Sequence, residues 1–201
     1  LVTGCKGYIG SVLTGELKKK GYFVKGLDTN YFSDCLLYNF KEDYEFKKKD
    51  IRDLEKEDLS DIDAVIHLAC ISNDPSFELN PNLGKSINLD AFEPIVKAAR
   101  ELDVKRFIYA SSSSVYGIKK EKNVHEDMKL EPLTDYSIYK VMCENILNKY
   151  SSENFITINA RPSTVCGFSK RQRFDLVVNI LTNQAYHTKK IKVFGGDQLR
   201  P

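Results

Sequence analysis

The sequence predicts an α/β fold in which a doubly wound parallel sheet is flanked by helices. Two observations support this class. Short runs rich in β-branched and apolar residues alternate with amphipathic stretches of helix length, the order expected of parallel strands joined by crossover helices. No internal repeat or low-complexity linker interrupts the alternation, and 201 residues suffice to bury one substantial core.

The elements are expected in a regular order. The predicted helices cover residues 9–20, 91–102 and 137–150, and the predicted strands cover residues 1–3, 23–28, 44–48, 64–69, 106–111 and 156–160. Gly21 gives the first helix a C-terminal stop, and Ile95, Val96, Ala99 and Leu102 recur at helical spacing in the second. A helix at 175–185 and a strand at 191–194 leave this alternation. We therefore expect a main domain at 1–168 and part of a substrate-binding region at 169–201.

Composition argues against several classes of protein. The net charge of +2 is too small for a nucleic-acid binder, and no apolar run approaches the roughly 20 residues of a membrane span. Five cysteines without a C-x-x-C pair predict neither a disulfide framework nor a metal site. The start carries no secretion signal, so a soluble cytoplasmic protein is expected. The first strand lacks opening residues and an initiator Met, and we expect truncation at both ends.

A glycine-rich turn follows the first strand. Gly4, Gly7 and Gly10 form a G-x-x-G-x-x-G pattern, with Tyr8 and Ile9 inside it, and the pattern opens a helix. The glycines permit a tight turn, a close backbone approach to a pyrophosphate and close packing of the helix on the strand. A chance glycine-rich turn is the alternative. In this context the turn predicts a Rossmann-type dinucleotide-binding domain.

A carboxylate follows at the spacing that dinucleotide binding requires. Asp28 ends the next strand, about 20 residues after the glycines, where it accepts hydrogen bonds from the adenosine ribose. Its charge repels a 2′-phosphate, which favours NAD over NADP. Lys6, inside the turn, is the contrary signal, and a plain solvent-facing Asp28 is the other alternative.

A tyrosine and a lysine stand four residues apart at the start of the helix at 137–150. This spacing places Tyr136 and Lys140 on one face, where a nearby ammonium favours the phenolate and lets Tyr136 exchange a proton. Exposed Tyr/Lys pairs on helices are also common by chance. A serine-rich segment at residues 111–114 ends a strand at the carboxyl edge of the sheet, where ligands of such folds bind.

Together these motifs resemble the extended short-chain dehydrogenase/reductase family, the NAD-dependent epimerase/dehydratase group, over nearly the whole chain. The resemblance implies that Ser112 bonds the substrate oxygen, Tyr136 is the acid/base, and Lys140 lowers its pKa and holds the nicotinamide ribose. It also implies a set of NAD contacts: Gly4, Gly7, Tyr8, Ile9, Gly10, Asp28, Asp50, Ile51, Leu68, Ala69, Asn88, Tyr136, Lys140 and Pro162.

The same resemblance implies a nucleotide-sugar substrate. Ser113 and Ser114 stand where sugar-nucleotide 4,6-dehydratases carry an Asp-Glu pair, and Ser114 stands where fucose-synthase-like enzymes carry a Cys. An epimerase is therefore expected, which oxidises a sugar hydroxyl and reduces the ketone again. A reductase or dehydrogenase with a dissociable cofactor, and a non-catalytic NAD-binding protein, are the alternatives.

Substrate contacts are expected from five residues. Ser113 follows the hydroxyl residue, and Thr164 replaces an Asn that contacts the nucleotide diphosphate in relatives. Arg171 and Arg173 have the planar forks that chelate phosphates, although the same charges are equally typical of a solvated loop. Arg200 matches a pyrophosphate-contacting arginine. Relatives usually dimerise through two long helices, here at 83–102 and 137–150, which implies a homodimer.

Overall fold

The computed structural model describes residues 1–38, 43–121, 123–193 and 195. Six parallel strands form one sheet in the order β3-β2-β1-β4-β5-β6, which confirms the predicted Rossmann-type class. The strands are β1 Val2–Thr3, β2 Lys25–Asp28, β3 Glu45–Lys48, β4 Ala64–His67, β5 Arg106–Ala110 and β6 Ile156–Ala160. The order reverses between β1 and β4, and such a reversal leaves a crevice for ligands at the carboxyl ends of the strands.

Helices connect and cover the sheet. They are α1 Gly10–Lys19, α2 Asp74–Leu79, α3 Pro81–Lys85, α4 Phe92–Glu101, α5 Asp135–Tyr150 and α6 Val177–Thr188, with a π-helical turn at Ser86–Asp90 between α3 and α4. Short 3₁₀ turns lie at Ile51–Asp53, Lys56–Leu59 and Ser113–Tyr116. Within the described part of the chain, no helix combines the length and apolar character needed to cross a membrane.

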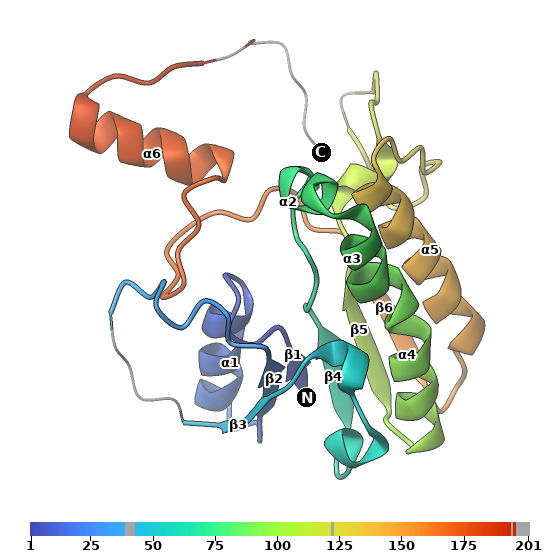
Figure 1. The fold of residues 1–201 in the computed structure, drawn as a ribbon. Helices are drawn as coiled ribbons and strands as arrows, with labels where there is room; N and C mark the ends of the chain where they lie inside the picture. The colour runs from blue at the N-terminus through green and yellow to red at the C-terminus, as the bar shows by residue number, and fades with distance from the viewer. Residues whose placement is uncertain (39–42, 122, 194, 196–201) are drawn as a thin grey trace.

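Two apolar clusters hold the layers together. On one face, Val65, Phe107 and Tyr109 of the sheet are buried beneath α4 and α5, which lie side by side in Figure 1. On the other, Val2, Cys5 and Val24 pack with residues of α1. Helix α6 lies apart from the sheet in Figure 1, and Asn179 is its one buried residue.

The strand predicted at 191–194 is not observed over its described residues, and helix α2 was not predicted from the sequence. Residues 191–193 have no regular structure, and Phe194 lies outside the described residues, so no strand follows α6 there. The Asn73-Asp74-Pro75 stretch has the composition of a turn, but it begins helix α2. Asn73 accepts a hydrogen bond from the Ser76 N–H at 2.7 Å, and Pro75 stands in the first turn, where a missing N–H costs nothing.

Candidate active site at the carboxyl edge of the sheet

The glycine turn is built from backbone contacts that leave no room for side chains. Gly4 has a φ of 72°, and its N–H donates to the Leu27 carbonyl at 2.8 Å. A Cβ on Gly4 would lie 2.7 Å from the Ala69 nitrogen, and one on Gly10 would lie 2.1 Å from the Gly4 oxygen. The turn therefore requires glycine at both positions, and a glycine-rich turn that opens a helix is the arrangement that binds a pyrophosphate in Rossmann-type folds.

Asp28 is tied to this turn. Its carboxylate accepts hydrogen bonds from the Lys6 N–H at 3.0 Å and from the Asn30 N–H at 2.8 Å. The Lys6 ammonium lies 4.2 Å from the centroid of the Phe46 ring. The carboxylate thus sits directly at the end of β2 beside the glycines, while the lysine charge lies over an aromatic side chain of β3.

The other predicted cofactor contacts lie along the same edge. The Leu68 N–H donates to the Thr3 carbonyl at 3.1 Å, and the Ala69 N–H donates to the Thr3 hydroxyl at 3.4 Å. Asp50 bonds the Arg52 guanidinium at 2.8 and 3.0 Å, which lowers the pKa of Asp50 below its usual range, and Ile51 is buried. The structure brings these residues together because β1 to β4 end in register.

One residue of the turn, Tyr8, contacts a distant segment. The Tyr8 hydroxyl donates to the Gly167 carbonyl at 2.7 Å and accepts from the Asn179 amide at 3.1 Å. The Ser169 hydroxyl donates to the Tyr8 carbonyl at 2.8 Å. Ile9 remains 38% exposed. The segment after β6 is therefore packed on the glycine turn, a contact that no sequence motif indicated.

Asn88 holds a loop of the site. Its side-chain amide accepts from the Ile71 N–H at 2.8 Å and donates to the Ile71 carbonyl at 2.9 Å. It lies in the π-helical turn at Ser86–Asp90, a rare geometry that is common at functional sites. Both ends of the amide are therefore bound to the backbone after β4, and its contact with a cofactor stays a prediction.

The three predicted catalytic side chains converge. Thr134 and Ser137 form a capping box that starts α5, which places Tyr136 in the first turn of the helix and Lys140 one turn later. The Lys140 ammonium donates to the Ala110 carbonyl at 2.6 Å and lies 5.5 Å from the centroid of the Tyr136 ring. The Ser112 hydroxyl lies close enough to Tyr136 to lower the pKa of the phenol.

Burial and charge act on Tyr136 in opposite directions. Burial raises the pKa of the phenol, and Lys140 and the Ser112 hydroxyl lower it, with a net pKa above the usual value of 10.0. Lys140 thus acts in the expected direction, but in the protein alone desolvation outweighs it. A positively charged ring bound beside the phenol would add to the effect of Lys140.

A cysteine that no motif indicated lies at the centre of this cluster. Lys140 donates to the Cys70 sulfur at 3.8 Å, and its ammonium is 4.7 Å from the centroid of the Tyr109 ring. Burial lowers the pKa of Lys140, but the interactions with Cys70 and Tyr136 outweigh it and raise the pKa overall. The only signal in the sequence is that Cys70 directly follows Ala69 at the carboxyl end of β4.

A buried ion pair supports the helix that carries Tyr136 and Lys140. Glu144, 2% exposed, accepts hydrogen bonds from Arg161 Nε at 2.9 Å and Nη2 at 2.6 Å, and also from the Ser111 hydroxyl. Arg161 Nη1 donates to the Tyr116 hydroxyl at 3.0 Å. The hydrogen bonds to Glu144, and to a smaller extent the one to Tyr116, raise the pKa of Arg161 above its usual range. The network joins α5 to the ends of β5 and β6.

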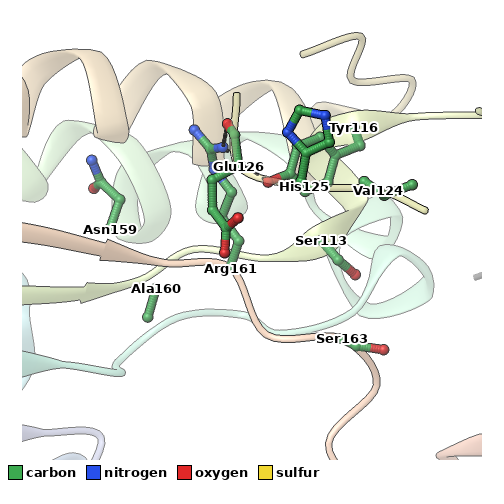
Figure 2. A pocket seen from close by; sticks show the side chains of 9 residues that line it. All are labelled: Ser113, Tyr116, Val124, His125, Glu126, Asn159, Ala160, Arg161 and Ser163. Carbon is green, nitrogen blue, oxygen red and sulfur yellow. Dashed lines mark hydrogen bonds between the residues drawn. The ribbon is translucent and has the colours of Figure 1, made fainter. Parts of the chain in front are cut away.

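The predicted substrate residues are more dispersed. Ser113 donates its N–H to the Pro162 carbonyl at 3.0 Å and lines a cavity of about 410 Å³, seen in Figure 2. Its wall consists of Ser113, Tyr116, Val124, His125, Glu126, Asn159, Ala160, Arg161 and Ser163. Thr164 is half-buried next to this segment and is not among the lining residues. Arg200 lies outside the described residues.

The two arginines after β6 occupy different surroundings. Arg173 bonds Asp175 at 3.0 and 2.5 Å and donates to the Ser72 hydroxyl at 3.1 Å, which brings it to the loop that carries Cys70. The Arg171 guanidinium lies 4.1 Å from the centroid of the Phe32 ring, and its Nε is buried without a hydrogen-bond partner among the described residues. The structure brings only Arg173 toward the catalytic cluster.

Comparison of the sequence with known proteins identifies relatives of this chain. A sequence profile described as NAD dependent epimerase/dehydratase family matches residues 1–201. An uncharacterized UDP-glucose epimerase, YtcB, of Bacillus subtilis is 33% identical over 98% of this chain and 66% of its own length. The chain thus spans just under two thirds of that relative.

Solved structures share the fold. An NAD dependent NDP-hexosamine 5,6-dehydratase, TunA, is 26% identical with a TM-score of 0.87 over 99% of this chain and 65% of its own. A UDP-glucuronic acid 4-epimerase from Bacillus cereus, solved with UDP-glucuronic acid and NAD, is 29% identical with a TM-score of 0.79, covering 96% of this chain and 65% of its own.

Proposed function

The chain belongs to the NAD dependent epimerase/dehydratase family, and we propose that the whole protein is an NAD-dependent nucleotide-sugar epimerase. One observation carries the proposal. The glycine turn, Asp28 and the Ser112, Tyr136 and Lys140 side chains meet at the carboxyl edge of a single parallel sheet. A dinucleotide laid along that edge would have its pyrophosphate at the glycines and its redox end at the tyrosine.

Each of the three catalytic candidates has its own role in the proposed proton transfer. Tyr136 takes the proton of the sugar hydroxyl as the C–H bond of the same carbon breaks, and later returns it to the oxygen. Ser112 holds that oxygen, and Lys140 stabilises the phenolate. NAD, when bound, supplies the hydride acceptor and donor. Oxidation followed by reduction on the other face leaves no net redox change.

The cofactor-binding roles follow the positions on the edge. Gly4, Gly7, Tyr8, Ile9 and Gly10 would hold the pyrophosphate, and Asp28 the adenosine ribose. The other proposed contacts are Asp50, Ile51, Leu68, Ala69, Asn88, Tyr136, Lys140 and Pro162. Two features support NAD over NADP: the Asp28 carboxylate at the turn, and the Lys6 ammonium lying over Phe46.

Substrate recognition is proposed at the open side of the cluster. Ser113, Thr164, Arg171, Arg173 and Arg200 are the candidate contacts, with the arginines suited to a diphosphate. The relatives of known reaction include a dehydratase as well as epimerases. Ser113 and Ser114 follow Ser112 in this chain, in place of the acidic pair that the resemblance implies for 4,6-dehydratases, and epimerisation fits better than that elimination.

The organisation of the whole protein is also a proposal. Residues 1–168 would form the NAD-binding domain, and residues 169–201 would begin the substrate-binding region. We propose a homodimer through α4 and α5, because Ile138 and Met142 leave apolar surface on α5, and sedimentation of the full-length protein tests it. The five free cysteines support a reducing compartment such as the cytoplasm, which cell fractionation tests.

The experiment follows a nucleotide sugar by NMR in the presence of the full-length protein and NAD. An epimerase converts the sugar to a mixture with its epimer while the absorbance of NADH does not accumulate. Steady NADH production from one substrate would instead select a dehydrogenase. Release of water to give an unsaturated or deoxy-keto sugar would select a dehydratase. Binding of NAD without any conversion would select a non-catalytic protein.

A further inference from the structure

We infer that Cys70 is a positioning residue for the proposed catalytic pair. Its sulfur holds the Lys140 ammonium beside Tyr136, where that charge acts on the phenol. The inference rests on the proposed function only where it treats Tyr136 and Lys140 as catalytic. The contact between Cys70 and Lys140 does not depend on that function.

Cys70 is fixed on both sides. Ala69, before it, donates its N–H to the Thr3 hydroxyl at 3.4 Å. Ile71, after it, has both its N–H and its carbonyl bound to the Asn88 amide, at 2.8 and 2.9 Å. The backbone around the thiol is therefore anchored to β1 and to the π-helical turn. A side chain so placed holds its partner in one position.

The Lys140 ammonium needs such a partner. Lys140 is 4% exposed, and a buried ammonium is costly unless its N–H groups are bonded. The Ala110 carbonyl takes one N–H at 2.6 Å and the Cys70 sulfur a second at 3.8 Å. An ammonium has three donors, so one N–H remains for a further partner. Removing the sulfur would free a second N–H and loosen the ammonium.

The electrostatic surroundings give the direction of the effect. The charged and polar groups that act on Tyr136 or Lys140 come from six parts of the fold: His67 in β4, Cys70 after β4, Asp74 in α2, Tyr109 in β5, Ser112 after β5, and Arg173 after β6, together with Cys143 in α5 itself. Lys140 and Ser112 lower the pKa of Tyr136, and Lys140 lowers it by more than Cys70 or Asp74 raises it. Loss of the sulfur would loosen the Lys140 ammonium, so the pKa of the phenol should rise.

The type of acceptor matters. A thiol sulfur is a weak hydrogen-bond acceptor, so it orients the ammonium while cancelling little of its charge. Alanine would remove the acceptor, and serine would keep one of similar size. Cys70→Ala and Cys70→Ser should therefore differ, and a purely space-filling role for Cys70 would not separate them in the same way.

The first test titrates Tyr136 directly in the full-length protein without added cofactor. Tyrosine labelled with ¹³C at Cζ reports each phenol by NMR, and Tyr136→Phe identifies the signal. Cys70→Ala should raise the pKa of Tyr136 by roughly half a unit, and Cys70→Ser should return it toward the wild-type value. Cys35→Ala, at an exposed cysteine, should leave it unchanged. Equal values in wild type and Cys70→Ala would overturn the inference.

A second readout uses turnover. The acid limb of the kcat profile should move to higher pH in Cys70→Ala by the same amount, with KM for the nucleotide sugar unchanged. Should Cys70→Ala fail to fold, Cys70→Val fills the space without an acceptor and gives the same comparison. If the wild-type protein turns over no sugar nucleotide, the proposed function fails, while the NMR titration still decides the role of Cys70.

Discussion

The glycine turn and the Tyr136/Lys140 cluster lie at the same edge of the sheet but are built in different ways. The turn is almost entirely backbone, closed by the Gly4 N–H on the Leu27 carbonyl and by contacts that exclude a Cβ. The cluster depends on side chains from α5, β5 and the loops after β4 and β5. The difference teaches that a local pattern encodes the first region, whereas the second arises only when distant segments meet.

Tyr136→Phe should have the largest effect, and only on the side-chain region. It removes the proton acceptor, so kcat should fall by about 10²–10⁴-fold, while NAD affinity, to which the glycine turn and Asp28 contribute most, should fall far less. Turnover and titration with NAD measure the two. Tyr139→Phe is the control, because Tyr139 lies on the same helix as Tyr136 but packs against Phe77 of α2. Equal losses of kcat in Tyr136→Phe and Tyr139→Phe would contradict this division between the two regions.

Glu144→Gln should come next. It takes the charge from a buried carboxylate and leaves Arg161 without its partner, which typically costs about 3–5 kcal/mol of unfolding free energy. Urea unfolding of the full-length protein measures it. Glu16→Gln removes an exposed partner of Lys19 and should change the midpoint little. A small effect of Glu144→Gln would show that the network does not hold α5 in place.

Gly10→Ala tests the backbone region. Its Cβ would lie 2.1 Å from the Gly4 oxygen, so the variant should lose about 3 kcal/mol of stability, the upper end for overpacking, together with NAD binding. Gly15→Ala, in the same helix with open space around it, should instead gain about 0.5–1 kcal/mol. Similar thermal unfolding of both variants would contradict the close contact.

The smallest effect is expected at edge strand β3. There Lys47, and Lys49 just after the strand, form ion pairs with Asp58 in the turn at Lys56–Leu59. Burial raises the pKa of Asp58, but bonds from the Glu55 N–H, Lys47 and Lys49 outweigh it and lower the pKa from 3.8 to about 2. This stability is present above pH about 4 and is lost as the pH falls through 2, a change of roughly 2 kcal/mol. Unfolding midpoints from pH 7 to about 2 measure it. Asp58→Asn should remove that dependence, and an unchanged profile would refute it.

Much of the fold was predictable because its signals are local. Each sheet strand was found within two residues of its bounds, since short β-branched runs alternate with helical periods. Helix α2 was missed because Asn73, Asp74 and Pro75 are typical of both a turn and a helix start. The strand predicted at 191–194 is absent over 191–193, where apolar residues alone suggested it.

The candidate site was predictable only in part. Tyr136, Lys140 and Ser112 follow recognisable spacings, and the structure brings them together. Cys70 and Glu144 carry no motif, since their roles depend on which strand ends meet α5 in three dimensions. Likewise, the packing of Gly167, Ser169 and Asn179 on Tyr8 joins residues about 160 positions apart, beyond the reach of any local pattern.

A crystal structure of the full-length protein with NAD tests the central claim most directly. We predict the pyrophosphate against the Gly4–Gly10 turn, the adenosine ribose on Asp28 and the nicotinamide ribose beside Tyr136 and Lys140. A dinucleotide bound elsewhere, or bound at the turn with its nicotinamide directed away from Tyr136, would contradict the account.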